Sequence, residues 1–296
     1  MKLVFLGTSS MVPTKERNHT AVLLLYKDEG ILVDCGEGTQ RQLKFARVKP
    51  SRITKILITH WHGDHVFGLP GLIQTLGSEE YGRVLKIYGP KGSKRMFEKV
   101  LEAFVLEARI EYEVIEVSRG VFFENKEFTL KALPMSHSVP CLAYRFQEKD
   151  TRKIIMERVK KLGLPEGPLL GELQRGRSVE YKGKLIKPEQ VSRIKRGKGV
   201  CFIFDTKLNE NCIEIAENAD LLVCEATFSS EHEEKAQLYK HLTAKQAALI
   251  ANNANVKRLV LTHFSQRYKN TQDIEEEASQ LFDKVVAAQD LMEIVL

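Results

Sequence analysis

Three histidines and one aspartate lie within six residues of this chain, in the run His60-Trp61-His62-Gly63-Asp64-His65. Neutral imidazole is a common protein ligand of zinc, and a carboxylate beside it suits a second metal ion. Histidine clusters also occur in tags and charged loops. This one is internal and not repetitive, follows an apolar strand pattern, and contains three of only eight histidines. The run therefore predicts a two-metal hydrolytic centre.

Further candidate ligands follow other apolar runs of the chain. Taken singly, His137 and His263 are of a kind that more often packs or faces solvent than binds a metal. Together with the first run they complete two sets of ligands, namely His60, His62 and His137 for one ion, and Asp64, His65 and His263 for the other. Two cations about 3.5–4 Å apart repel each other, so the centre needs a bridging carboxylate and a bridging hydroxide. Asp205, at a strand end, is available as the bridge.

The predicted centre would supply its own nucleophile, because metal binding lowers the pKa of water from about 15.7 to about 7. No serine or cysteine nucleophile is then needed, so we expect direct hydrolysis. Asp64 has a second oxygen with which to orient or deprotonate the attacking water. Glu225 could hold His241 as an imidazolium that protonates an alkoxide leaving group. A capping or surface role for His241, just before a predicted helix, is equally open.

The candidate residues share a position, because five short apolar runs each lead to a polar residue. They are residues 31–33 before Asp34, 56–58 before His60, 201–204 before Asp205, 221–224 before Glu225 and 259–262 before His263. Sheets with helices on their faces build active sites where such strand ends meet. Further strands are predicted at 3–7, 21–26, 85–88, 128–133 and 142–146, and helices at 66–76, 93–104, 243–252 and 274–285, the last with Asp273 as N-cap. The fold class is therefore α/β with mixed sheets.

The composition is that of an ordinary globular protein, with 296 residues, 43% of them hydrophobic and 28% charged. No apolar stretch approaches the ~18 residues that span a bilayer, and the N-terminal run is a strand pattern without the features of a signal peptide. The five cysteines are odd in number and form no Cys-x-x-Cys pair, which indicates buried thiols in a reducing compartment. We therefore expect a cytoplasmic protein with no membrane partner.

Residues 149–198 break the alternation of strands and helices. This segment carries 15 Lys or Arg residues against 6 Asp or Glu, a surplus of nine positive charges in a chain whose net charge is +6. Glycines and prolines interrupt it and it has little apolar periodicity, so we interpret it as an arm inserted into a single domain of residues 1–296. Many charged insertions are only solvated loops, but this surplus favours contact with nucleic-acid phosphates.

Several further segments are distinctive in their sequence and order. They are Phe5-Leu6-Gly7-Thr8, Pro13-Thr14-Lys15-Glu16-Arg17-Asn18, Asp34-Cys35-Gly36-Glu37-Gly38-Thr39-Gln40, Gly163-Leu164-Pro165-Glu166-Gly167-Pro168-Leu169, Glu225-Ala226-Thr227-Phe228, His241-Leu242-Thr243 and Thr262-His263-Phe264-Ser265-Gln266-Arg267-Tyr268. With the histidine run, which many hydrolases share, these segments closely resemble the metallo-β-lactamase superfamily. Within it, the chain resembles the ribonuclease Z family of tRNA 3′ endonucleases over nearly its whole length.

The resemblance implies a metallo-β-lactamase-type αβ/βα four-layer sandwich with two Zn²⁺ ions per subunit, held by the seven ligands above. It also implies a homodimer whose flexible arm grips precursor tRNA. Asp64 is then the general base, and Glu225 and His241 assist the leaving group. The implied substrate-binding residues are Lys15, Arg17 and Asn18 near the cleavage point, Gly167 and Pro168 in the arm, and Arg267. The implied reaction removes the 3′ trailer, leaving a 3′-hydroxyl on the tRNA and a 5′-phosphate on the trailer.

Two residues depart from the family pattern. The family usually has glycine before the bridging aspartate and histidine before the glutamate, and here these positions hold Phe204 and Cys224. Replacement of a glycine beside a metal ligand can alter the backbone path, so Asp205 is the ligand most affected.

Two other functions stay open on the sequence alone. One is a small-molecule hydrolase of the same superfamily, acting on a phosphodiester, thioester or lactone, which would have no use for a basic arm. The other is an RNA-binding protein whose metals only stabilise the fold. The complete ligand set and the additional acid pair argue against the second, because structural metal sites are closed by protein ligands.

Overall fold

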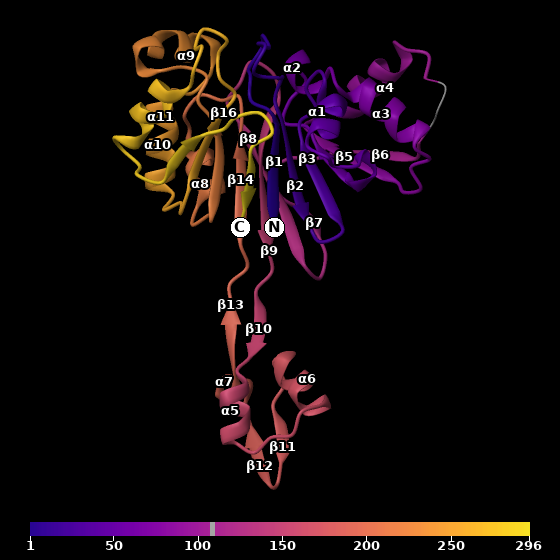
Figure 1. Ribbon diagram of the computed structural model, residues 1–296, viewed down its shortest axis with the longest axis vertical. Coiled ribbons are helices and arrows are strands. Elements are labelled where there is room, and N and C mark those ends of the chain that lie inside the picture. The colour runs from indigo at the N-terminus through magenta and orange to yellow at the C-terminus, as the bar shows by residue number, and fades with distance from the viewer. Residues whose placement is uncertain (107–109) are drawn as a thin grey trace. The chain divides into compact units, whose positions relative to one another are not determined.

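The computed structural model describes residues 1–106 and 110–296, which form two compact units (Figure 1). The first unit contains Met1–Glu124, Leu130–Phe146 and Gly199–Leu296, and the second contains Asn125–Thr129 and Gln147–Lys198. Residues 149–198, predicted as an inserted arm, therefore all lie in the second unit. Among the described residues, no helix has the length and apolar character needed to cross a membrane.

A seven-stranded mixed sheet forms one half of the first unit. Its strands, in order across the sheet, are β18 (Glu293–Val295), β1 (Lys2–Gly7), β2 (Ala21–Tyr26), β3 (Glu29–Val33), β4 (Lys55–Leu57), β5 (Leu85–Gly89) and β6 (Tyr112–Glu116). Strands β3 to β6 are parallel neighbours, so their carboxyl ends lie at one edge. Helices α1 (Thr39–Phe45), α3 (Leu69–Ser78) and α4 (Ser93–Glu102) pack against this sheet.

A second seven-stranded sheet forms the other half. Its strands, in order, are β17 (Val285–Ala287), β16 (Leu259–Thr262), β15 (Leu221–Glu225), β14 (Gly199–Ile203), β9 (Cys141–Glu148), β8 (Phe128–Met135) and β7 (Gly120–Glu124). Strands β14 to β17 are parallel neighbours. Helices α8 (Glu210–Ala216), α10 (Ala244–Asn253) and α11 (Gln272–Ser279) pack against this sheet, and α9 (Glu233–Tyr239) precedes α10.

The two sheets of the first unit pack face to face between two outer layers of helices (Figure 1). The rings of Tyr26 in β2 and Phe146 in β9 lie 5.2 Å apart, and those of Tyr88 in β5 and Phe122 in β7 lie 4.9 Å apart. The hydroxyl of Tyr144 in β9 donates to the carbonyl of Ile58 at 2.7 Å. Strands covered on both faces carry nearly continuous apolar runs, which is why the sequence revealed them. The predicted αβ/βα sandwich is confirmed.

Two predicted helices have other limits in the structure. The helix predicted at 66–76 is in fact two helices, α2 (Gly63–Val66) and α3, because Pro70 lies in the first turn of α3 and lacks the N–H that a longer helix would need. The helix predicted at 274–285 ends at Ser279. Val285 instead begins β17, where a β-branched residue pairs well with the parallel strand β16. The N-cap of α11 is Thr271 and not Asp273.

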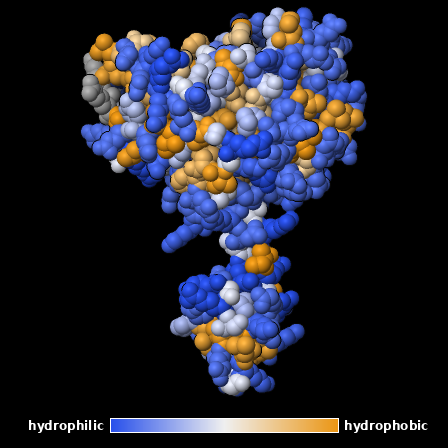
Figure 2. Space-filling model, turned by 180° about the vertical axis from the view of Figure 1, so that it is seen from behind, coloured by the Kyte–Doolittle hydropathy of each residue, from blue (hydrophilic) through white to orange (hydrophobic). Residues whose placement is uncertain are grey.

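The second unit has secondary structure of its own. Strand β10 (Thr151–Ile154) pairs with β13 (Ser192–Lys195), and β11 (Val179–Tyr181) forms a hairpin with β12 (Lys184–Ile186). Three helices, α5 (Met156–Lys161), α6 (Pro168–Gln174) and α7 (Pro188–Val191), complete it. Its core contains Val159, Leu164, Leu173, Val179, Ile186 and Val191. The face of this unit in Figure 2 is mostly hydrophilic, with hydrophobic residues gathered at its upper end and in its lower part. The unit is therefore a folded element and not only a solvated loop.

Replacing Leu173 with alanine is expected to loosen the second unit and leave the first intact. Leu173 is fully buried in the small core of this unit, and truncating a buried leucine costs about 2–5 kcal/mol. Amide hydrogen exchange should become faster in α5, α6 and α7 and stay unchanged in α10. Leu185→Ala, at an exposed position of the same unit, is the matched control. Equal protection of α5 to α7 in both variants would contradict the prediction.

Candidate metal centre and active site

Four of the predicted ligands come from the short segment between β4 and α3. His60 and His62 precede α2, and Asp64 and His65 lie within it. His60 and His65 are fully buried, and Asp64 is nearly so. The other three ligands follow strands of the second sheet, namely His137 after β8, Asp205 after β14 and His263 after β16.

The structure brings all seven predicted ligands together in two neighbouring groups. The possible ligand atoms of one group lie within 4.8 Å of one another, and its members are His60, His62, His137 and Asp205. The same limit holds for the second group, Asp64, His65 and His263. A third group, Asp205, His241 and His263, overlaps the other two. The ligand sets expected from the sequence thus lie close together in space, and their binding of metal stays a prediction.

The carboxylate of Asp205 faces both groups with different oxygens. Its Oδ2 lies 3.6 Å from Nε2 of His60 and 3.7 Å from Nε2 of His137. Its Oδ1 lies 3.3 Å from Nε2 of His65 and 3.1 Å from Nε2 of His263. A carboxylate with its oxygens divided in this way can bridge two metal ions, one through each oxygen.

The residues present fit two metal ions. Among the described residues, His60 Nε2 and Asp205 Oδ1 are buried without a hydrogen-bond partner, and such orphaned atoms are rare unless an ion or water binds them. Burial lowers the pKa of His60, which keeps the imidazole in the neutral form that binds metal. Burial alone would raise the pKa of Asp205, but the surrounding histidines hold it well below its usual range. Imidazole nitrogens and carboxylate oxygens are donors that suit zinc.

Asp34, at the end of β3, orients His65 from behind. It accepts hydrogen bonds at 2.7 Å from both the backbone N–H and the hydroxyl of Thr59, and Nδ1 of His65 lies 2.6 Å from it. This contact leaves Nε2 of His65 directed at the centre, as metal-binding histidines require. Asp34 and His263 both have positive φ, at 58° and 61°, which strains a non-glycine residue by about 1–3 kcal/mol and is typical of functional sites. The sequence placed Asp34 at the rim but assigned it no role.

A histidine and a glutamate form a pair beside the centre. Nδ1 of His241 lies 3.0 Å from Oε2 of Glu225 and 3.8 Å from Oδ2 of Asp205. Burial alone would lower the pKa of His241, but the two carboxylates raise it to about 9, so the ring carries a proton at neutral pH. The capping role left open for His241 belongs instead to Thr243, which forms a capping box with Gln246 at the start of α10.

Known proteins resemble this chain over its whole length. A family model described as "Anti-Pycsar protein Apyc1" matches residues 1–149. The ribonuclease Z of Methanothermobacter thermautotrophicus is 43% identical over 295 residues, which cover 99% of this chain and 96% of that protein. The ribonuclease Z of Bacillus cereus strain B4264 is 40% identical, with 98% of each chain covered. The chain belongs to the ribonuclease Z family.

Solved structures of similar fold include a family member. Human tRNase Z, short form, is 29% identical to this chain with a TM-score of 0.72, and the match covers 100% of this chain and 99% of the human one. The metallo-β-lactamase fold protein YhfI of Bacillus subtilis has the same TM-score at 20% identity, covering 99% and 98% of the two chains, which is a similarity of fold alone. The predicted metallo-β-lactamase-type fold is confirmed, and membership of the ribonuclease Z family makes the chain an enzyme.

The two residues that depart from the family pattern are both buried. Phe204 is fully buried, with its ring 6.4 Å from that of His65. Cys224 lies in β15 and packs in the core beneath α8 and α10. Asp205 still faces both ligand groups, so Phe204 leaves the bridging position of the carboxylate intact.

Some of the residues predicted to bind substrate are accessible. Lys15 and Arg267 are exposed, and the guanidinium of Arg267 lies 5.0 Å from the ring centroid of Phe228. In the second unit, Gly167 is exposed with a φ of 138°, a value that favours glycine, and Pro168 begins α6. These positions can be reached by a large substrate.

Arg17 and Asn18 lie differently, because both turn inward. Arg17 is only 7% exposed, and its Nη2 donates to the carbonyl of Tyr268 at 2.6 Å. Asn18 is half-buried, and its Nδ2 donates to the carbonyl of Glu37 at 2.5 Å. The 13–18 loop is therefore held by its last two residues and exposes its tip.

Proposed function

We propose that this enzyme is a zinc-dependent endoribonuclease that removes the 3′ trailer from precursor tRNA, leaving a 3′-hydroxyl on the tRNA and a 5′-phosphate on the trailer. The observation that carries the proposal is the carboxylate of Asp205, divided between two histidine groups, with the Glu225–His241 pair beside it. Relatives at about 40% identity named ribonuclease Z support the substrate.

The chemistry is the hydrolysis of one phosphodiester. Two zinc ions held by the seven ligands would supply hydroxide at neutral pH and offset charge on the phosphate. Although burial opposes it, His65 and His263 hold the pKa of Asp64 well below its usual range, so its carboxylate is ionised and can hold the proton of the attacking water. The oxygen of the attacking water forms a bond to phosphorus, and the bond between phosphorus and the ribose O3′ breaks. His241 gives its proton to the departing O3′.

Positive charge would bind the rest of the tRNA. Lys15 and Arg267 are exposed near the loops that surround the centre, and residues 149–198 carry 15 Lys or Arg. Structured RNA is recognised mainly by the shape and charge of its backbone, which suits such a surface. As the sequence led us to expect, the proposal includes a cytoplasmic location. It also includes a homodimer in which the arm of one subunit grips the tRNA cleaved by the other.

Removing zinc with a chelator should stop the cleavage of precursor tRNA, and adding zinc back should restore it. Metal analysis of the purified protein should find two zinc ions per chain, since the ligands form two groups. Mapping the ends of the products should show a 3′-hydroxyl on the tRNA and a 5′-phosphate on the trailer. One ion per chain and no hydrolysis would instead favour an RNA-binding protein whose metal stabilises the fold.

A further inference from the structure

Asp290 joins three separate parts of the first unit and belongs to none of the sequence motifs. It lies between β17 and β18. Its Oδ1 accepts a hydrogen bond from the hydroxyl of Thr8 at 2.8 Å. Its Oδ2 accepts from the backbone N–H of Asn18 at 2.7 Å and from Nε2 of Gln42 at 2.9 Å. One carboxylate thus connects the end of β1, the 13–18 loop and helix α1.

The same loop is fixed to the segment that follows His263. Nη2 of Arg17 donates to the carbonyls of Tyr268 and Ser265, at 2.6 and 3.4 Å. The carbonyl of Asn18 accepts from the N–H of Ser9 at 2.9 Å. The loop therefore has two inward anchors, and its exposed tip carries Lys15.

Thr8 extends the connection to the metal centre. Its hydroxyl donates to Asp290, while its carbonyl accepts from the N–H of Phe264 at 2.8 Å. The N–H of Ser10 in turn donates a hydrogen bond to the carbonyl of Phe264 at 3.0 Å. Phe264 follows His263, so Asp290 fixes the loop to the backbone that carries a predicted metal ligand.

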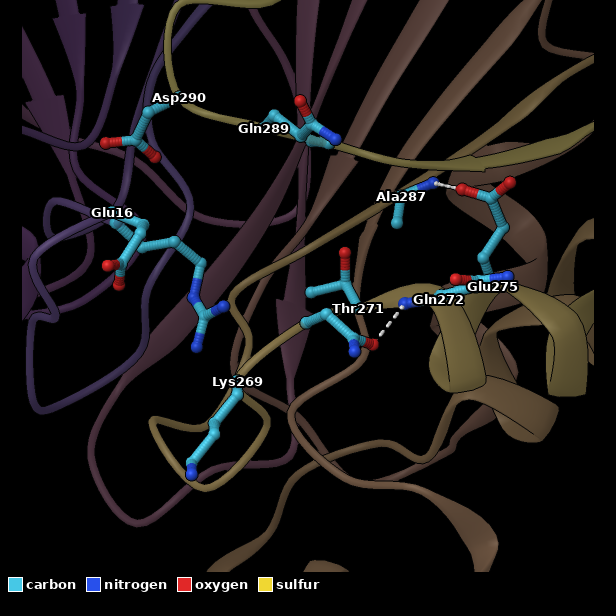
Figure 3. Close-up of a pocket in the computed structure, with 11 residues that line it drawn as sticks. Glu16, Lys269, Thr271, Gln272, Glu275, Ala287, Gln289 and Asp290 are labelled. Carbon is cyan, nitrogen blue, oxygen red and sulfur yellow. Dashed lines mark hydrogen bonds between the residues drawn. The ribbon is translucent and has the colours of Figure 1, made fainter.

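A cavity of about 560 Å³ lies beside these contacts, and Figure 3 shows Asp290 and Glu16 on one side of it and Gln272 and Glu275 on the other. Burial raises the pKa of Asp290 to about 6, so the fold keeps an acid where it is poorly solvated. Because the side chain of Asp290 adjoins this open space, the residue is not needed to fill a packed core. Its hydrogen bonds are what it contributes.

We propose that Asp290 is a positioning residue for the reaction, holding the 13–18 loop in register with the His263 segment so that cleavage falls at one phosphodiester. In this arrangement Arg17 and Asn18 serve as anchors, and the exposed tip meets the RNA. The inference rests on the proposed function, in which this loop lies near the cleavage point.

The carboxylate of Asp290 accepts from all the donors that converge here. The N–H of Asn18, the amide of Gln42 and the hydroxyl of Thr8 together use both oxygens of Asp290. An asparagine side chain has one acceptor oxygen, so its NH₂ group would face Thr8, whose hydroxyl could turn to accept but whose backbone N–H, which also bonds the carboxylate, can only donate. The change Asp290→Asn therefore keeps the size of the side chain and removes its charge and one of its two acceptor oxygens, whereas Asp290→Glu keeps both oxygens.

The test compares Asp290→Asn with the parent enzyme on precursor tRNA. We expect a higher KM, a kcat/KM lower by about 10- to 100-fold because small misplacements of reacting groups have effects of this size, and tRNA 3′ ends spread over neighbouring nucleotides. Zinc content and hydrolysis of bis(p-nitrophenyl) phosphate should match the parent. Asp290→Glu should restore a single 3′ end.

Glu275→Gln is the matched control, because Glu275 lines the same cavity but accepts its hydrogen bond from the N–H of Ala287. It should cleave like the parent. The inference is overturned if Asp290→Asn keeps the parent's KM and single 3′ end, or if it loses zinc and activity on both substrates together, which indicates a general structural role. If the parent cleaves no precursor tRNA, the proposed function fails and takes this inference with it.

Discussion

Replacing His241 with alanine is expected to slow the cleavage of precursor tRNA by about 10²- to 10⁴-fold, the usual contribution of a general acid, and to spare the hydrolysis of bis(p-nitrophenyl) phosphate. The two substrates differ in the group that leaves. The 3′ oxygen of a ribose departs as a strongly basic alkoxide and needs a proton, whereas p-nitrophenolate is stable without one. His241 can supply that proton, because the nearby carboxylates raise its pKa to about 9.

Glu225→Gln should show the same dependence on the leaving group, since it removes the charge that lies 3.0 Å from Nδ1 of His241. His232→Ala is a suitable control, because His232 stacks on Phe228 at 6.4 Å and contacts no predicted ligand in the described residues. Rates and zinc content would be measured together for each variant. An equal loss on both substrates with zinc intact would show that His241 shapes the site without donating a proton.

The cluster of candidate metal ligands could be predicted because its members occupy positions that local sequence reveals. His60, Asp205 and His263 each follow an apolar run, and the runs are strands β4, β14 and β16. Strands that are parallel neighbours end at one edge, and face-to-face packing brings the edges of the two sheets together. Residue type and strand position therefore sufficed to predict which side chains the fold brings together.

The anchors of the 13–18 loop could not be predicted in the same way. The contacts of Asp290 join residues 8, 18, 42 and 290, and no local pattern records such a meeting. Arg17 also differs from what its charge suggests, because a cationic residue in a surface motif favours RNA contact, yet its guanidinium satisfies backbone carbonyls inside. Only the tertiary structure separates a residue that touches substrate from one that holds the loop.

The core of the second unit could not be predicted from the sequence for a related reason. Its buried residues come from three short helices, a hairpin and the loop between α5 and α6, so residues such as Val159, Leu173 and Ile186 share no period. Periodicity detects an element only when that element is long enough to repeat its buried face. The excess of positive charge in residues 149–198 needs no periodicity, and it was therefore the part of this segment that the sequence could interpret.

Deleting residues 149–198 is expected to lower kcat/KM for precursor tRNA by about 10²-fold or more at moderate salt, because each phosphate contact adds affinity that depends on counterion release. The N–H of Glu148 donates to the carbonyl of Lys198 at 2.9 Å, so a short glycine–serine link can close the gap. Hydrolysis of bis(p-nitrophenyl) phosphate should continue at the parent rate, since all seven ligands and the Glu225–His241 pair lie in the first unit.

The dependence of RNA affinity on salt separates the contribution of charged contacts from that of shape recognition. A milder variant changes the exposed Arg193, Lys195 and Arg196 to glutamine. For every phosphate that is then no longer neutralised by a cation, the slope of log affinity against log salt should fall by about 0.7–0.9. The deletion should flatten that slope further. If the protein were instead a small-molecule hydrolase, the deletion should change neither the cleavage rate nor its dependence on salt, because such an enzyme has no use for a basic arm. If the deleted enzyme cleaves precursor tRNA as well as the parent, with an unchanged slope, the basic segment has no part in binding RNA.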